Sequence, residues 1–394
     1  MIPRTKVNYG LRDLARALVT REGTSSQRDA LLGALRGWMG HERLALAPSG
    51  RGALFAILST TDRPDVVVPA YTCKAVVEAA VLAGKNVRYV DCAEGDFNLD
   101  ARALEGVVDD RCVVIATHQF GIPCDIERIV ALCRERGALV VEDAAPALGT
   151  RVAGRPVGTF GDVGFFSFDS TKLITVPMKG GLIVAQEQAW FERIAQKLEA
   201  LEPMPARHKL ELLTQAAAML LIESEPAYRV FHWLMFDRRG RYTNDGPGLD
   251  VRKTAFYRYA FAEWQASIAR AQIERIDEIV EQRRRVYARL RGGLEGCRSF
   301  ELPPQDDQGS WACIRFPIRV RGDKLDFYRR GVRRGVDFAF SFTFLAEPGR
   351  FPHADRLAAA VLDIPFYFKL SERELRETIA RLRSIDEEVS REGQ

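Results

Sequence analysis

Two apolar segments of the chain each end on a residue that could take part in catalysis. Residues 161–172 run through phenylalanine, serine and threonine to Lys172, and residues 139–143 end on Asp143. An amine can form a Schiff base with an aldehyde, and a carboxylate can keep a pyridine nitrogen protonated so that the ring accepts electrons. If the two segments are neighbouring buried strands, Lys172 and Asp143 together predict a pyridoxal phosphate (PLP) site.

A turn of small residues at 48–54 could hold the phosphate of that cofactor. It contains two glycines and opens a helical run, so its backbone N–H groups and the helix dipole favour an anion, and Arg51 could add a charge-assisted contact. Singly, each candidate has a structural explanation: a cap for Asp143, a satisfied strand hydroxyl for Ser167, a solvated amine for Lys172. Their order and their placement at strand ends favour the PLP site over these alternatives.

The elements that must position these residues alternate between β-branched runs and helical patterns from about residue 45 to 190. This alternation predicts an α/β fold, with a mostly parallel sheet covered by helices on both faces. The apolar runs lack strict alternation, which indicates strands buried on both faces. The predicted strands are 66–69, 86–90, 112–117, 138–142, 163–168 and 181–185. The predicted helices are 52–59, 74–83 and 125–136.

The remainder of the chain predicts a helical insert and a smaller α+β domain. Helical patterns at 192–199 and 210–222 are followed by a polar segment rich in turn residues at 237–248. We therefore expect a large domain over 1–250, with an insert at 199–250, and a small C-terminal domain over 251–394. In the small domain we expect a long helix at 263–290, strands at 311–320 and 338–344, and helices at 324–334 and 371–385, the last with the capping box Ser371 and Glu374.

Composition excludes several classes of protein. The 394 residues carry 57 Lys and Arg against 53 Asp and Glu, a balance too even to indicate nucleic-acid binding. The seven cysteines show no CxxC pair, so we expect no disulfide framework and no metal site. No apolar stretch is long enough to span a bilayer, and there is no signal segment. We therefore expect a cytoplasmic protein without a membrane span.

Five segments resemble the DegT/StrS-type aminotransferases, PLP-dependent enzymes of fold type I. The segments are 49–54 (SGRGAL), 68–72 (VPAYT), 117–121 (THQFG) with 141–145 (VEDAA), and 158–172, which begins GTFGD and ends on Lys172. Residues 263–266 and 275–279 resemble the helix that opens the small domain of that family. The resemblance extends from about residue 45 to the C-terminus.

The resemblance implies a role for individual residues. Lys172 would be the Schiff-base lysine and Asp143 the partner of the pyridine nitrogen, while Arg51, Gly52 and Ser167 would hold the phosphate. Such enzymes are typically homodimers with shared active sites. In this chain the segment that reaches the partner's site would be 256–260, with Arg258 at the phosphate-binding position and Ala260 in place of an arginine. The N-terminal segment would pack on the small domain.

Two further departures from the family pattern lie close to the expected cofactor. Pro146 replaces a glutamine, and Cys73 replaces the aromatic residue that stacks on the ring, a role that Tyr71 could take. His118 could line the substrate pocket or be a hydrogen-bonded structural histidine.

The function that the resemblance implies is amino transfer from L-glutamate or L-glutamine to a keto-sugar, perhaps nucleotide-linked, in polysaccharide or secondary-metabolite biosynthesis. The acceptor itself is left open. One alternative is a PLP-dependent sugar dehydratase, although that subgroup carries histidine in place of the lysine. The other is a PLP-binding regulatory or assembly protein without turnover.

Overall fold

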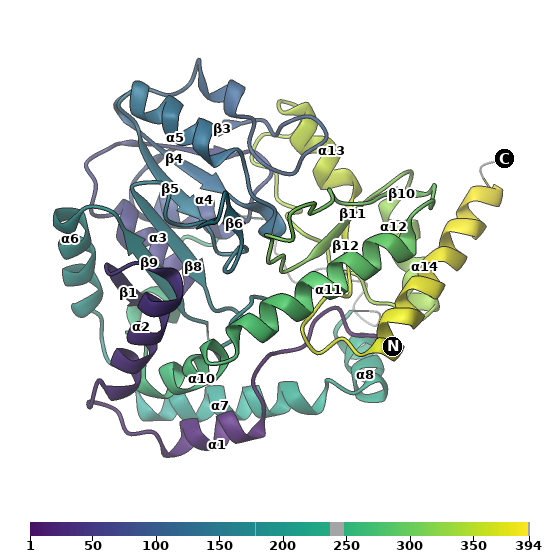
Figure 1. Ribbon diagram of the computed structural model, residues 1–394, viewed down its shortest axis with the longest axis horizontal. Helices are drawn as coiled ribbons and strands as arrows, with labels where there is room; N and C mark the ends of the chain where they lie inside the picture. Colours follow the sequence, from purple (N-terminus) through teal and green to yellow (C-terminus); the bar gives the residue numbers. More distant parts are fainter. Residues whose placement is uncertain (178, 237–247, 393–394) are drawn as a thin grey trace.

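Seven strands form the largest sheet, in the order β1-β9-β8-β5-β4-β2-β3 (Figure 1). The computed structural model describes residues 1–177, 179–236 and 248–392. Strands β3, β2, β4, β5 and β8 run parallel, whereas β9 is antiparallel to β8 and to β1. This mixed, mostly parallel sheet confirms the predicted α/β fold. The strands are β1 (Leu44–Ala47), β2 (Asp65–Pro69), β3 (Asn86–Val90), β4 (Cys112–Thr117), β5 (Leu139–Asp143), β8 (Val163–Ser167) and β9 (Gly181–Ala185).

Helices cover both faces of this sheet, as the unbroken apolar strands predicted. Val66 and Val113 belong to a hydrophobic cluster with α3, α4 and α6, whereas the adjacent Val67 and Val114 belong to a second cluster with α5. Successive side chains of a strand point to opposite faces, so both faces are buried. The covering helices are α3 (Gly50–Leu58), α4 (Lys74–Leu82), α5 (Ile126–Glu135) and α6 (Gln188–Glu199), with short 3₁₀ turns η1 (Ala101–Leu104) and η2 (Gln119–Gly121) and the hairpin of β6 (Arg151–Val152) and β7 (Arg155–Pro156).

The strand register brings the candidate catalytic residues to one edge of the sheet. Strands β5 and β8 are parallel neighbours, with Asp143 opposite Phe165. Ser167 is the last residue of β8, and the loop that follows carries Lys172. Because parallel strands end at the same edge, Asp143, Ser167 and Lys172 emerge side by side, in the usual position of ligand sites in α/β sheets.

A second, antiparallel sheet lies in the C-terminal part of the chain, in the order β10-β11-β12. We call residues 276–392 the C-terminal unit. Most of its buried apolar side chains belong to one cluster that includes Phe316, Phe327 and Phe338. Its elements are α11 (Ile276–Leu294), β10 (Phe300–Glu301), β11 (Phe316–Val320), α12 (Lys324–Arg333), α13 (Pro352–Ala360), β12 (Val361–Ile364) and α14 (Glu372–Glu392).

Two predictions for this part of the chain were wrong in detail. The expected strand at 338–344 contributes only a single bridge, from Ala339 to Asp363, because Phe342 adopts a φ of 51° that no extended strand can contain. The expected helix at 263–290 is interrupted at Arg275, whose φ of −120° and ψ of 19° are not helical. The first piece, α10 (Glu263–Ile273), packs against helices α1 and α2.

The N-terminal helices and the insert form a helical layer along one side of the molecule (Figure 1). Val7, Leu212 and Trp264 share one buried cluster, so the N-terminal segment, the insert and α10 pack together. The helices of this layer are α1 (Leu11–Val19), α2 (Ser26–Met39), α7 (Ala206–Leu221) and α8 (Glu225–Met235), whereas the short α9 (Ala255–Arg258) packs against α3. The polar segment expected at 237–248 lies, except for Gly248, outside the described residues.

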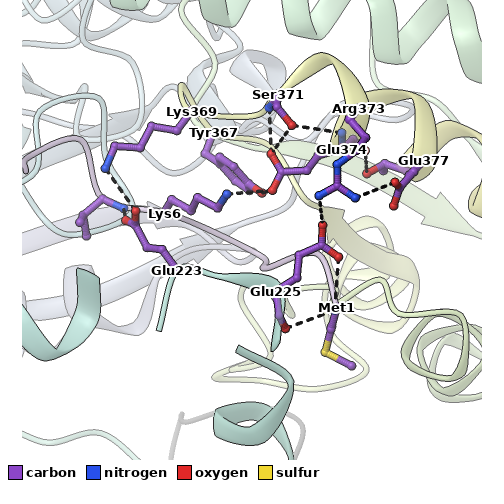
Figure 2. Close-up of polar contacts among 12 residues, drawn as sticks. Met1, Lys6, Glu223, Glu225, Tyr367, Lys369, Ser371, Arg373, Glu374 and Glu377 are labelled. Carbon is purple, nitrogen blue, oxygen red and sulfur yellow. Dashed lines mark hydrogen bonds and ion pairs between the residues drawn. The ribbon is translucent and has the colours of Figure 1, made fainter. Parts of the chain in front are cut away.

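Charged contacts fasten this layer to the C-terminal unit (Figure 2). Lys6 pairs with Glu374 at 2.8 Å, and Arg373 pairs with Glu225 of the insert at 2.5 Å. Glu374 also accepts hydrogen bonds from the backbone N–H and the hydroxyl of Ser371, which confirms the predicted capping box.

A buried cluster reinforces the same junction. The carboxylate of Asp337 is fully buried and accepts hydrogen bonds from Arg4 at 2.6 and 2.8 Å and from the Tyr228 hydroxyl at 2.6 Å. The first residues of the chain and the insert are therefore both held on the C-terminal unit. None of the described helices is long and apolar enough to cross a membrane.

Candidate active site

A cavity of about 320 Å³ opens where the large sheet meets the C-terminal unit. The carboxyl ends of β4, β5 and β8 supply Thr117, Asp143 and Ser167, and the C-terminal unit supplies Arg315 and Phe342. The remaining lining residues are Ser49, Gly50, Arg51, Leu54, Cys73, Ala75, Val76, Gln119, Phe120, Ala145, Pro146, Phe165, Asp169, Thr171, Lys172, Lys179, Ile314, Phe340 and Ser341. The cavity thus brings together four of the eight predicted site residues, Arg51, Asp143, Ser167 and Lys172.

Lys172 lies in the loop after β8, where its backbone N–H donates to the carbonyl of Asp169. Burial lowers the pKa of the Lys172 amine below its ordinary value, and the carboxylates of Asp143 and Asp169 only partly oppose this effect. A lowered pKa raises the neutral fraction of the amine, which is the form that attacks an aldehyde. The environment therefore suits a nucleophilic lysine.

Asp143 is 4% exposed and lies at the end of β5, opposite Thr117 of β4. Burial raises the pKa of its carboxyl group, while the Lys172 charge and the Ala145 backbone N–H, which donates to Oδ1 at 3.1 Å, lower it. A buried carboxylate with this little compensation attracts a cationic partner strongly. A protonated pyridine nitrogen provides such a partner.

The phosphate turn is tightly built around Ser49. The Ser49 hydroxyl accepts a hydrogen bond from the Gly52 N–H at 2.9 Å and donates to the carbonyl of Phe256 at 3.0 Å. A Cβ on Gly50 would lie 2.9 Å from the Cβ of Ser167, so the start of α3 and the end of β8 are in contact. This contact places the Ser167 hydroxyl beside the backbone N–H groups at the start of α3.

Arg51 and Lys179 supply positive charge to this end of the cavity. The Arg51 guanidinium lies 3.4 Å from Glu78 and 5.2 Å from the Phe256 ring centroid. Lys179 pairs with Asp169 at 3.0 Å. Burial raises the pKa of Asp169, but the charges of Lys179 and Lys172 and the hydrogen bonds to Asp169 together outweigh burial and hold that pKa at about 2. Both cations line the cavity and stand within reach of a bound phosphate.

Four of the predicted site residues do not line the cavity. One is Gly52, whose N–H donates to the Ser49 hydroxyl. His118 is fully buried behind Asp143, with Nε2 3.1 Å from Glu142 and Nδ1 accepting the Cys124 N–H, so it is a structural histidine rather than a substrate contact. Tyr71 is fully buried and donates to the carbonyl of Ser341. Arg258 pairs with Glu202 on the surface, at 2.9 Å.

Sequence patterns missed three cavity residues, Lys179, Arg315 and Phe342. Arg315 comes just before β11 and pairs with the buried Asp363 at 3.0 Å, so its guanidinium lines the cavity from the C-terminal unit. Phe342 lies against Phe120 of η2, with ring centroids 5.6 Å apart. Both phenylalanines have a positive φ, 61° for Phe120 and 51° for Phe342. A basic residue directly before a strand was the available signal for Arg315.

These residues fit PLP. The Gly50 to Ser167 contact forms a phosphate cradle, Asp143 is a buried acid for the ring nitrogen, and Lys172 is an amine with a lowered pKa. Cys73 and Pro146 line the same cavity, so both departures from the family pattern lie at the site itself.

Comparisons with known proteins agree with this geometry. The model of the DegT/DnrJ/EryC1/StrS aminotransferase family matches residues 26–383. GDP-perosamine synthase from Escherichia coli O157:H7 is 33% identical over 137 residues, which cover 34% of this chain and 37% of that protein.

Solved structures share the whole fold. The sugar aminotransferase CalS13 from Micromonospora echinospora superimposes with a TM-score of 0.75 at 22% identity, covering 98% of this chain and 100% of that one. Spr1654 from Streptococcus pneumoniae has been solved in a PLP form and a PMP form; the PLP form gives a TM-score of 0.76 at 18% identity, covering 98% of this chain and 99% of that one. The chain therefore belongs to the DegT/DnrJ/EryC1/StrS aminotransferase family and is a PLP-dependent aminotransferase.

Proposed function

We propose that this protein moves an amino group from L-glutamate or L-glutamine to a nucleotide-linked keto-sugar, in the biosynthesis of a polysaccharide or a secondary metabolite. The observation that carries the proposal is the convergence of Lys172, Asp143 and Ser167 in one cavity. The names of its relatives, which include a GDP-perosamine synthase and a sugar aminotransferase, support a sugar as the acceptor.

Each cavity residue has a defined part in this proposal. PLP, when bound, supplies an aldehyde that takes up the amino group and a ring that withdraws electrons from it. Lys172 then removes the proton from the donor α-carbon and later returns a proton to the acceptor carbon. Asp143 holds the ring nitrogen protonated. The N–H groups at Gly50 and Arg51, with the Ser167 hydroxyl, bind the phosphate.

Recognition of the donor falls to Arg315 in this proposal. Its guanidinium lines the cavity opposite the end of the large sheet and matches the planar geometry of a carboxylate. Asp363 fixes the direction of that guanidinium through the 3.0 Å ion pair. A donor carboxylate bound to Arg315 would place its α-carbon between the two units, on the same side as Lys172.

We also propose a homodimer whose subunits share active sites. Arg258 lies outside the cavity of its own chain and 59% of its side chain is exposed, so it is available to reach the phosphate site of a second copy. We also propose a domain division near residue 250, which leaves the seven-stranded sheet before it and the three-stranded sheet after it. The seven cysteines are all unpaired, which favours a reducing compartment and hence the cytoplasm.

Absorbance of the purified holoenzyme tests the function directly. Wild-type protein with PLP should show a visible band, which Lys172→Ala abolishes. Lys179→Ala should retain the band with weaker cofactor binding, because Lys179 is paired to Asp169 rather than bonded to PLP. Adding L-glutamate should convert the cofactor to its amine form, and a keto-sugar acceptor should restore the band.

Each outcome distinguishes one possible function from another. The absence of any visible band in the wild type would overturn the assignment of Lys172. A band that glutamate and glutamine leave unchanged would favour a binding protein without turnover. A keto-sugar panel scored by loss of the amine form identifies the acceptor.

A further inference from the structure

A second cavity, of about 460 Å³, lies in the C-terminal unit and shares no lining residue with the active site. One wall is the polar face of α11 and the opposite wall is the segment 305–313. Arginines dominate the lining, together with two aromatic rings. The lining residues are Glu281, Arg283, Arg284, Arg285, Tyr287, Ala288, Arg291, Gly292, Glu295, Gln305, Asp306, Gly309, Trp311 and Cys313.

Arg283 is the most unusual of these side chains because it is 2% exposed and no carboxylate within the described chain pairs with it. Its Nη1 donates to the carbonyls of Cys313 and Ile314, both at 3.3 Å, and its guanidinium lies 5.4 Å from the Phe366 ring centroid. The Nε atom is buried and has no partner. Burial lowers the pKa of Arg283 to about 10, since only neutral groups compensate its charge.

Two neighbouring arginines are also without a counter-ion. Arg284 donates only to backbone carbonyls, to Trp311 at 3.0 Å and to Gly149 at 3.4 Å. Arg291 makes no hydrogen bond or ion pair with any residue that the structure describes, and its Nε is buried. Residues 284 and 291 are two turns apart on α11 and share one face, beside the buried position of Arg283, and all three side chains line the cavity.

The cavity is lined by four arginines and three carboxylates, those of Glu281, Glu295 and Asp306, and within the described residues none of these carboxylates forms an ion pair with Arg283, Arg284 or Arg291. Both oxygens of Asp306 accept backbone N–H groups, from Ser310 at 3.0 Å and Trp311 at 2.8 Å. Glu281 pairs with Arg285 at 3.8 Å. A buried cation without a counter-ion is costly, so the buried Arg283, flanked by the half-buried Arg284 and Arg291, favours an anionic ligand.

We propose that this cavity binds the phosphoryl group of a small phosphorylated metabolite, held by Arg283, Arg284 and Arg291. Planar guanidinium groups bind phosphoryl oxygens in pairs. The rings of Trp311 and Tyr287 stand 6.5 Å apart in an edge arrangement and offer an apolar surface to the rest of the ligand. The site is independent of the proposed transfer reaction.

Calorimetric titration of the PLP-loaded enzyme tests the site, because bound PLP already occupies the other phosphate cradle. Inorganic phosphate, a nucleoside diphosphate and chloride at matched ionic strength are titrated in parallel. The tryptophan fluorescence of the wild type, compared with that of Trp311→Phe, is a second readout. Saturable binding of phosphate and of the diphosphate is expected, but not of chloride. Equal affinities would mean that the phosphoryl group is the whole ligand. Because the proposed active site also accepts a nucleotide, tighter binding of the diphosphate is assigned to the aromatic wall only if Arg284→Gln and Arg291→Gln weaken it; diphosphate binding that both variants leave unchanged belongs to the active site.

The variants Arg284→Gln and Arg291→Gln should each weaken binding at least about tenfold, the scale of one lost charge-assisted hydrogen bond. Arg289→Gln is the matched control, since this residue lies on the same helix but pairs with Glu372 on the surface. Its affinity should stay within about twofold of the wild type. Binding that all three variants leave unchanged, or no saturable binding by the wild type, would overturn the proposal.

Discussion

Gly52 offers a sharp test of the phosphate turn, because alanine at this position should destabilise the protein, whereas alanine usually stabilises a helix. Replacing a helical glycine by alanine generally stabilises by about 1 kcal/mol. At Gly52, however, the new Cβ would lie 2.6 Å from the carbonyl oxygen of Phe256 and 2.8 Å from Cγ of Pro48. The Phe256 carbonyl also accepts the Ser49 hydroxyl, so the backbone there cannot move without loss.

The magnitude follows from these two opposing terms. Overpacking in a close-packed region costs about 1–3 kcal/mol, which exceeds the gain in helix propensity. After subtracting the gain of about 1 kcal/mol, we expect Gly52→Ala to lower the free energy of unfolding by up to about 2 kcal/mol. Displacement of the turn from Ser167 should also weaken PLP binding about tenfold, which corresponds to about 1.4 kcal/mol.

Gly37→Ala provides the matched control. Gly37 lies in α2, and a Cβ there would meet no atom within 4 Å. The same substitution should therefore stabilise by about 0.5–1 kcal/mol and leave PLP affinity unchanged. Urea denaturation followed by circular dichroism, with a spectroscopic PLP titration, measures both quantities. If Gly52→Ala were as stable as Gly37→Ala and bound PLP normally, the geometric reasoning would be refuted.

Two further predictions concern buried charges. In cofactor-free protein, Asp143→Asn should lower the pKa of Lys172 further, because the Asp143 charge raises that pKa against the effect of burial. The pH dependence of Lys172 acetylation, followed by mass spectrometry, measures the pKa. An upward shift of the Lys172 pKa would contradict the prediction. Asp337→Asn should destabilise the protein by about 3–5 kcal/mol at pH 7, because Arg4 loses its buried partner. Burial raises the pKa of Asp337, but Arg4 and His232 together outweigh burial and depress it. This stability is therefore present above the unfolded pKa of about 3.9 and is lost as pH falls through the folded value. Urea midpoints should thus differ widely at pH 7 and converge in acid, and equal midpoints at pH 7 would exclude the effect.

The part of the site that sequence predicts well lies in one continuous α/β stretch. Asp143, Ser167 and Lys172 each follow an apolar strand whose pattern is local, and parallel pairing then brings those strand ends together. The turn at Ser49 is equally local. These features depend on neighbours in sequence, so periodicity and turn chemistry identify them.

The rest depends on contacts between distant parts of the chain. Arg315 reaches the cavity only because the C-terminal unit packs across the sheet edge. Its one local signal, a basic residue just before a strand, does not indicate that packing. His118 and Tyr71 lie in motifs close to the site but point into the core, a distinction set by tertiary packing. The segment 338–344 has the composition of a strand, yet the positive φ of Phe342 prevents an extended backbone there.

The contact between Phe120 and Phe342 has a consequence for engineering the substrate range. Left-handed backbone conformation costs a residue with a side chain about 1–2 kcal/mol, and glycine adopts it freely. Replacing Phe342 by glycine would remove a ring from the cavity wall while relieving that backbone cost, which offsets part of the lost packing. Phe165, on β8 and in an ordinary strand, offers no such compensation. Bulkier acceptors are therefore best accommodated from the C-terminal side, at Phe342.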